Sequence, residues 1–274
     1  MKLLIKILKK DFAIFFNISN ISLIILSFIV IIVSSISEIN AFIVSGKTYI
    51  SLEDAMFLAF RGPGNEYTFF QLLKWLLPIL IVLFIFGRMT NVELNNGYIY
   101  AIYRFGNKQS WLKGKFVFIF LFSFFYYICL YGISLIVFFF KFHLDGSFSY
   151  YLISSAEMNI SIIKYVSPLI LLLIMLILNI ISCFGILILQ ILISIITKKA
   201  YYGFLFSIIL ALISLTSNKL YYKLDVFFPL NYGIANRFNT VTSSGYICYL
   251  YICSIFLLLM YIGTLYVKRN EIFE

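Results

Sequence analysis

The feature that most constrains the fold is an uninterrupted apolar run at residues 165–197, bounded by Lys164 and Lys198. Its 33 residues include no Asp, Glu, Lys or Arg. As an α-helix the run is about 50 Å long, whereas the hydrocarbon core of a bilayer is about 30 Å thick. We therefore expect a membrane-spanning helix that either tilts strongly or projects beyond the bilayer at one end.

Further apolar runs make the chain a polytopic membrane protein. They occupy residues 18–36, 72–86, 116–140, 200–216 and 246–267. Of the 274 residues, 63% are hydrophobic and 12% are charged, whereas a soluble domain is about half apolar and a quarter charged. This composition excludes a disordered chain and a disulfide-rich secreted protein. A soluble enzyme with a membrane tail is also excluded, because no long stretch is free of apolar runs. The predicted fold is all-α, with six transmembrane helices in a single domain at residues 1–274.

The N-terminal segment, residues 1–16, has two chemically different sides at helical spacing. One side carries lysines and the other carries large apolar residues: Lys2, Lys6, Lys9 and Lys10 on the first, and Leu4, Leu8, Phe12 and Phe15 on the second. A basic amphipathic helix of this kind is typical of the membrane interface. We predict an interfacial helix before the first span.

Positive charge predicts how the chain is oriented. The net charge is +10, and cytoplasmic loops of membrane proteins collect Lys and Arg. Six spans place both termini on one side, and that side holds 13 Lys and Arg against 8 on the other. Abundant Ile, Phe, Tyr, Lys and Asn are typical of an AT-rich bacterial genome. We expect a multi-pass protein of the bacterial cytoplasmic membrane with both termini in the cytoplasm.

The spans contain almost no ionisable side chains. Lys74, near one end of the second run, is the nearest exception and is expected to extend to the interface. Residues 38–66, which include Glu53 and Asp54, are interpreted as a polar loop. Proton-driven carriers need Asp, Glu, His or Arg at membrane depth. The sequence therefore argues against such a carrier, and more weakly against a sodium-driven one.

Motifs for covalent chemistry or nucleotide hydrolysis are not found. The chain has a single histidine, His143, so it cannot form an H-E-x-x-H metal site. Gly106 and Gly114 lie eight residues apart, too far for a phosphate-binding loop. We predict no enzyme activity, no catalytic residue, and no metal or cofactor bound by this chain. If transport is powered by ATP, the ATPase must be another chain.

The polar segment at residues 87–115 is the most informative part of the sequence. Glu93 is followed four residues later by Gly97, and a dense apolar and aromatic stretch comes next: Tyr98, Ile99, Tyr100, Ile102 and Tyr103. Arg104, the break Gly106-Asn107-Lys108 and finally Lys115 complete the segment before the third span.

This pattern resembles the loop after the second span in the membrane (permease) subunit of type-2 ABC exporters. In that family an acidic residue and a glycine precede a short apolar helix, a break with a basic residue, and a lysine before the third span. Tyr98 stands where the family usually has Thr, and the frequent Pro before the basic residue is missing. An amphipathic first helix, six spans and internal termini extend the resemblance over nearly the whole chain.

The resemblance implies that the segment after Glu93 is a cytoplasmic coupling helix that docks on an ATP-binding subunit. The expected docking residues are Glu93, Gly97, Tyr98, Ile99, Tyr100, Ile102, Tyr103 and Arg104. Exposed aromatic and aliphatic side chains suit a groove on a partner, and the charged residues would set the register. From the residues alone, the alternative that this helix lies on the membrane stays open.

Two further sets of residues have open interpretations. Residues 217–245 form the last outer loop, where Phe227, Phe228, Pro229 and Leu230 are either a re-entrant gate or an aromatic interfacial anchor. Asn179, Ser182 and Gln190 lie on the long fourth run and either bond across a helix interface or line a cavity.

The resemblance implies the permease subunit of an ATP-driven exporter. Its partners would be an ATP-binding subunit, which uses ATP and Mg, and a second permease subunit in a homo- or heterodimer. The uncharged spans suit an amphipathic or hydrophobic cargo such as a peptide, lipid or antibiotic. We expect no nucleic-acid partner, because the net positive charge is explained by the topology. Two alternatives remain: a self-sufficient secondary carrier, and a non-transporting immunity or sensor protein of the membrane.

Overall fold

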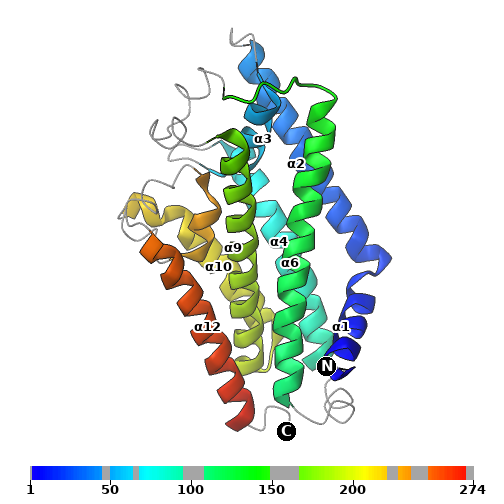
Figure 1. Ribbon diagram of the computed structural model, residues 1–274. Helices are drawn as coiled ribbons and strands as arrows, with labels where there is room; N and C mark the ends of the chain where they lie inside the picture. The colour runs from blue at the N-terminus through cyan, green and yellow to red at the C-terminus, as the bar shows by residue number, and fades with distance from the viewer. Residues whose placement is uncertain are drawn as a thin grey trace.

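The computed structural model describes residues 2–44, 50–63, 68–94, 108–148, 167–220, 228–235 and 246–269. These ranges contain helices and no strand (Figure 1). The helices are α1 (Lys2–Phe15), α2 (Ile18–Val44), α3 (Leu52–Phe60), α4 (Phe69–Val92), α6 (Lys108–Phe139), α9 (Pro168–Thr197), α10 (Ala200–Leu220), the short 3-10 helix η3 (Pro229–Gly233) and α12 (Tyr246–Arg269).

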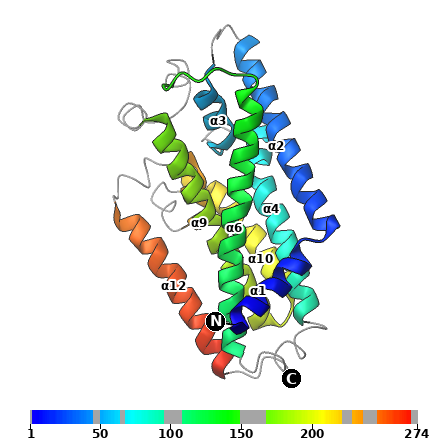
Figure 2. The same ribbon diagram turned by 45° about the vertical axis from the view of Figure 1, so that its right-hand side comes forward.

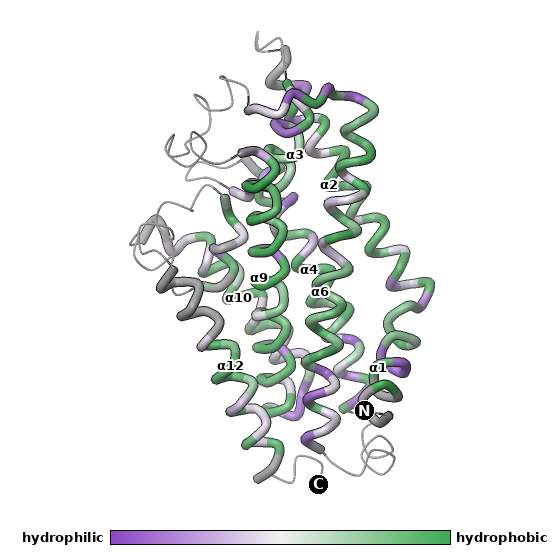
Figure 3. Tube along the Cα trace, viewed as in Figure 1, coloured by the Kyte–Doolittle hydropathy of each residue, from purple (hydrophilic) through white to green (hydrophobic). Residues whose placement is uncertain are grey.

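Five of the helices are long and apolar enough to cross a membrane. The stretches that qualify are Ile18–Ala41, Phe69–Val92, Gln109–Phe139, Pro168–Thr197 and Ala200–Ser217, and α12 adds the shorter apolar stretch Ser254–Val267. Figure 3 shows hydrophilic residues gathered at both ends of the bundle, with apolar stretches between them. This is the architecture of a multi-pass membrane protein.

The helix α9 is central and packs against α4, α6, α10, α12 and η3. One end of the bundle holds α1, the C-terminal ends of α4 and α12, and the first turns of α6 (Figures 1 and 2). We call it the α1 end, and the opposite end, where α3 lies, the α3 end. Figure 2 shows α1 lying across the lower parts of α4 and α6.

Aromatic packing holds α1 against the bundle. The ring centroids of Phe15 and Phe122 are 4.2 Å apart, and those of Phe12 and Phe118 are 5.0 Å apart with the rings nearly perpendicular. Phe15 is fully buried. Because Phe118 and Phe122 both lie on α6, the position of α1 depends on the N-terminal part of that helix.

Within residues 38–66, which we predicted as a polar loop, the described residues 38–44 belong to α2 and Leu52–Phe60 form α3, which corrects that expectation. Glu38 lies on α2, and all nine residues of α3 are buried. Ser51 and Asp54 form a reciprocal capping box at the start of α3, which satisfies N–H groups that would otherwise lack partners. Glu53 accepts hydrogen bonds from the backbone N–H groups of Asp145 and Gly146. The acidic residues that looked like loop residues therefore have partners inside the fold.

Residues 228–235 pack against α9 and α10. Leu230, Asn231, Ile234 and Ala235 are buried. The amide of Asn231 donates to Ser217 on α10, at 2.9 Å, and the backbone N–H of Ala235 donates to the carbonyl of Arg61. This short segment therefore joins α10 to the residue that follows α3.

Candidate functional site

A buried charge cluster lies at the α1 end, where α1, α4 and α6 meet. The ammonium of Lys115 donates to Asp11 Oδ1 at 2.7 Å and to Glu93 Oε1 at 2.5 Å. The three side chains are 3%, 1% and 6% exposed. Buried charges are tolerated when they are paired and hydrogen-bonded. Lys115 thus connects three segments that are distant in the sequence.

Among the described residues, the two carboxylates Asp11 and Glu93 share the ammonium of Lys115. Within the described residues, Asp11 Oδ2 is buried and has no hydrogen-bond partner. Burial raises the pKa of Asp11 to about 6, and the Glu93 charge adds to this, whereas Lys115 acts in the opposite direction. The ammonium of Lys115 also lies 5.9 Å from the centroid of the Trp111 ring.

Glu93, the first of the expected docking residues, has a buried side chain that is bound to Lys115. Its docking on a partner stays a prediction. The loop predicted at residues 87–115 is also shorter in the structure, because α4 extends to Val92 and α6 begins at Lys108. Gly97, Tyr98, Ile99, Tyr100, Ile102, Tyr103 and Arg104 lie outside the described residues. What the structure does show is that the two helices flanking this segment are tied together by the Glu93–Lys115 pair.

A second charge cluster lies at the α3 end. Glu38 Oε1 accepts hydrogen bonds from Arg61 at 3.0 Å and from Gln71 at 2.9 Å, and Oε2 accepts from Lys74. Lys74 also donates to the carbonyl of Leu58, at 3.1 Å. We expected Lys74 to extend to the interface, which is wrong: the residue is buried, because internal acceptors from α2 and α3 reach its ammonium.

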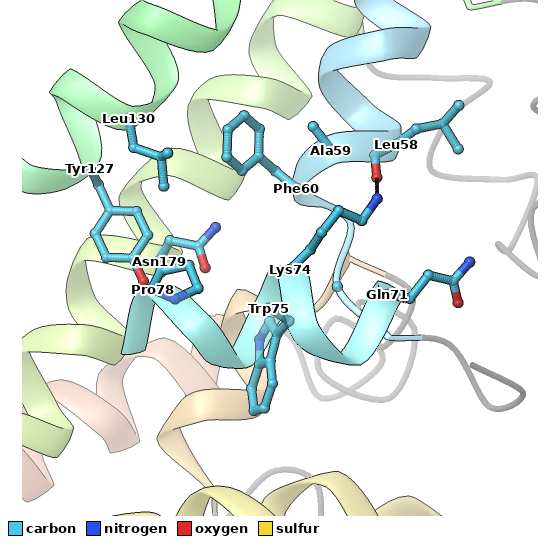
Figure 4. A pocket seen from close by; sticks show the side chains of 11 residues that line it. Leu58, Ala59, Phe60, Gln71, Lys74, Trp75, Pro78, Tyr127, Leu130 and Asn179 are labelled. Carbon is cyan, nitrogen blue, oxygen red and sulfur yellow. Dashed lines mark hydrogen bonds between the residues drawn. The ribbon is translucent and has the colours of Figure 1, made fainter. Parts of the chain in front are cut away.

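Beside this cluster is a small cavity of about 20 Å³, shown in Figure 4. Residues from α3, α4, α6 and α9 line it, together with Gly62: Leu58, Ala59, Phe60, Gln71, Lys74, Trp75, Pro78, Tyr127, Leu130 and Asn179. A volume of this size has room for about one water molecule. The cavity cannot hold a peptide or lipid in this conformation.

The polar residues of α9 combine both roles that the sequence left open. Asn179 donates to the Tyr131 hydroxyl on α6, at 3.0 Å, and also lines the cavity. Gln190 donates to the Leu83 carbonyl on α4, at 2.8 Å. Ser182 is buried on the same helix. Gln190 therefore bonds across a helix interface, and Asn179 does so while facing the cavity.

The residues predicted as a re-entrant gate are partly described. Phe228 is half-buried, Pro229 begins η3 and Leu230 is buried, whereas Phe227 lies outside the described residues. A Cβ on Gly233, at the end of η3, would lie 2.6 Å from the Asn179 side-chain oxygen. A side chain at this position would therefore displace the Asn179 amide.

The sequence did not lead us to predict the two charge clusters, although each contains one acidic residue that stands out from its neighbours in the sequence. Asp11 is the one acidic residue among the lysines of the first sixteen residues, and Glu38 interrupts a long apolar helix. An ionisable residue within an apolar segment usually pairs with another polar or charged group. In the part of the chain that the structure describes, no group of three His, Cys, Asp or Glu could hold a metal ion.

Comparisons with protein-family models, curated proteins and solved structures found no match to this chain.

Proposed function

We propose that this chain is the permease subunit of an ATP-driven exporter similar to type-2 ABC exporters. In this proposal α12 is the sixth span, and α1 is the interfacial amphipathic helix. The α1 end faces the cytoplasm of a bacterium, with both termini there. Two permease subunits, identical or related, enclose the path of an amphipathic or hydrophobic cargo.

The observation that carries the proposal is the Glu93–Lys115 pair at the base of residues 95–107. These residues hold the apolar and aromatic part of the pattern that resembles a coupling helix. The pair ties the end of α4 to the start of α6, and Asp11 adds α1 to the same junction. A force on the segment between α4 and α6 would therefore move these three helices together, as a coupling element requires.

The distribution of charge supports an external source of energy. In the described spans, Glu38, Lys74 and Lys115 lie near the helix ends, and the polar residues further inside, such as Asn179 and Gln190, are neutral. A proton-driven carrier needs titratable groups at membrane depth. We propose that an ATP-binding subunit hydrolyses ATP with Mg and that the permease has no enzyme activity of its own.

The proposal is tested by capturing the tagged chain from its native membrane in mild detergent. We expect co-purification of a chain with a phosphate-binding loop. Because the aromatic side chains form the proposed contact, Tyr98→Ala combined with Tyr103→Ala should remove that partner. Mass spectrometry identifies the captured chain, and fluorescence size-exclusion chromatography verifies that the variant is folded.

The matched control is Tyr202→Ala, which removes an exposed tyrosine at the first turn of α10. It should retain the ATP-binding partner. The proposal is contradicted if the wild type captures no chain with a phosphate-binding loop, or if the double variant retains it as well as the control does.

A further inference from the structure

We infer that the bundle has a gate at the α3 end, which opens where Arg61 and Gly62, after α3, meet Ile234 and Ala235, after η3. We call this meeting point the outer contact. The inference deepens the transport proposal and rests on it, because a gate serves a path. Three observations carry it: the outer contact itself, the different helices that hold its two sides, and the polar side chains beneath it.

The outer contact is small and joins residues that are far apart in the sequence. The backbone N–H of Ala235 donates to the carbonyl of Arg61 at 2.8 Å, the one backbone hydrogen bond between the described residues 50–63 and 228–235. Gly62 has a φ of +72°, and a Cβ there would lie 3.2 Å from the Ile234 side chain. Because Ile234 and Ala235 are buried, the gate is closed in this structure.

The α3 side of the outer contact is held by α2 and α6. Arg61 pairs with Glu38 of α2, at 3.0 Å. Phe60 stacks on Tyr131 of α6, with ring centroids 3.8 Å apart, and Figure 4 shows the Phe60 ring pointing away from its own helix toward α6. This side would therefore move with α2 and α6.

The η3 side is held by α9 and α10. Asn231 donates to Ser217 on α10 at 2.9 Å, and η3 packs against α9, where Gly233 approaches Asn179 closely. The two sides of the outer contact are thus fixed to different helices. A shift of α9 and α10 relative to α2 and α6 would act on the outer contact, where one backbone hydrogen bond and an apolar contact oppose it.

Neutral polar side chains lie beneath the outer contact, between α6 and α9. Asn179 donates to the Tyr131 hydroxyl at 3.0 Å, and Ser182 is buried one turn further along α9. Phe60 covers Tyr131, and η3 packs against Asn179. The cavity of about 20 Å³ shows that α3 leaves a gap against these helices, and a gap forfeits packing attraction. Opening would expose hydrogen-bonding groups to an amphipathic cargo.

A native thiol can report the opening. Cys183 is buried on α9, one turn beyond Asn179 from the end of α9 that lies at the α3 end (Figure 1). The test extracts the full chain from its native membrane in nanodiscs, which leave both ends of the bundle accessible, and adds a sulfonated maleimide that does not enter lipid. Peptide mass spectrometry measures the label on each cysteine. We expect slow labelling of Cys183 and none of Cys129, which is exposed on the apolar span of α6.

Ala235→Pro should loosen the gate, because proline has no N–H to donate to Arg61. The preceding Ile234 is extended, with φ −103° and ψ 105°, which is the conformation favoured before proline. Loss of one hydrogen bond should raise the labelling rate of Cys183 about fivefold. Ala235→Ser retains the N–H and is the matched control, which should label like the wild type.

A disulfide across the outer contact should have the opposite effect. Gly62→Cys combined with Ile234→Cys places two thiols together, and oxidation should slow the labelling of Cys183 about tenfold or more. The control is Gly62→Ser combined with Ile234→Ser, which makes side chains of similar size and cannot be crosslinked. Mass spectrometry verifies that the disulfide has formed.

ATP with Mg²⁺ separates the gate from its source of energy. Labelling that ATP accelerates, and that the disulfide blocks, supports both the gate and the transport proposal. Labelling that depends on the outer contact but not on ATP supports the gate and counts against ATP-driven transport. The gate is overturned if Ala235→Pro and Ala235→Ser label Cys183 at the same rate, or if the crosslinked protein labels as fast as the serine control.

Discussion

The ammonium of Lys115 lies 2.5 Å from Glu93 Oε1 and joins the start of α6 to the end of α4. The two residues stand at opposite ends of the segment that most resembles a coupling helix. Asp11 accepts from the same ammonium, at 2.7 Å. These two ion pairs therefore hold together α4 and α6, the helices on either side of the proposed docking segment. They also attach α1, the first helix of the chain, to both.

Lys115→Met should destabilise the protein strongly. The substitution leaves Asp11 and Glu93 buried without a counter-charge, and removing one partner of a buried ion pair costs about 3–5 kcal/mol. Lys113, two residues earlier, is exposed, so Lys113→Met should stay within about 0.5 kcal/mol of the wild type. Thermal unfolding of the two variants in the same detergent measures the difference, and equal stability would refute a structural role for the junction.

Exchanging the charges provides a second test of the junction. Glu93→Lys alone places two ammonium groups together, whereas the double variant Glu93→Lys with Lys115→Glu restores two carboxylates around one ammonium. We expect the double variant to recover about half or more of the stability lost by the single one, a coupling of about 1–3 kcal/mol. Additive losses in this cycle would show that the two side chains do not interact.

The stability of the protein should depend on pH through Asp11. Its pKa is raised from 3.8 to about 6, so the folded protein binds this proton more tightly than the unfolded chain does. The contribution is complete below about pH 4 and is lost as the pH rises through about 6, on the order of 3 kcal/mol in total. Asp11→Asn should remove this part of the pH dependence in melting curves between pH 4.5 and 7.5.

The control for that experiment is Asp145→Asn, which alters an exposed carboxylate. It should leave the loss of stability between pH 4.5 and 7.5 unchanged. A wild-type protein whose stability is flat over this range, or an Asp11→Asn variant whose stability falls with pH as much as that of the wild type, would contradict the account of the buried cluster.

Gly203→Ala should separate α9 from α10. A methyl group at this position would overlap the carbonyl oxygen of Gln190 and the Ser194 hydroxyl, and a backbone atom cannot move aside as a flexible side chain can. We expect a loss of about 1–3 kcal/mol. Gly132→Ala is the matched control, since its added methyl group meets no atom within 4 Å. Similar melting temperatures for the two variants would contradict the close packing.

The sequence predicts the long helices well, because an apolar run long enough to cross a bilayer can adopt few structures other than a helix. The run at residues 165–197 is observed as Pro168–Thr197, and the run beginning at residue 18 is observed from Ile18. The sequence does not reveal α3, since its acidic first turn looks like a polar loop when the acceptors and donors around it are unknown. Only the fold supplies those partners.

The candidate sites are harder to predict from the sequence, because their residues are far apart in the chain. Lys115 and Asp11 are 104 residues apart, and Lys74 and Glu38 are 36 apart. Neither pair lies at helical spacing, so periodicity cannot bring them together. Asn179 and Gln190 were found from the sequence because an amide in an apolar run needs a partner, but the identity of each partner came from the structure.

The most direct test of the central claim is to place a photo-crosslinking amino acid at Tyr100 in cells and irradiate the native membranes. The account predicts a crosslink to a chain that contains the phosphate-binding motif G-x-x-x-x-G-K-[ST]. The same probe at Tyr261, which is exposed on α12, should give no such product. Crosslinks from Tyr100 to lipid alone, or to proteins without that motif, would contradict docking on an ATP-binding subunit.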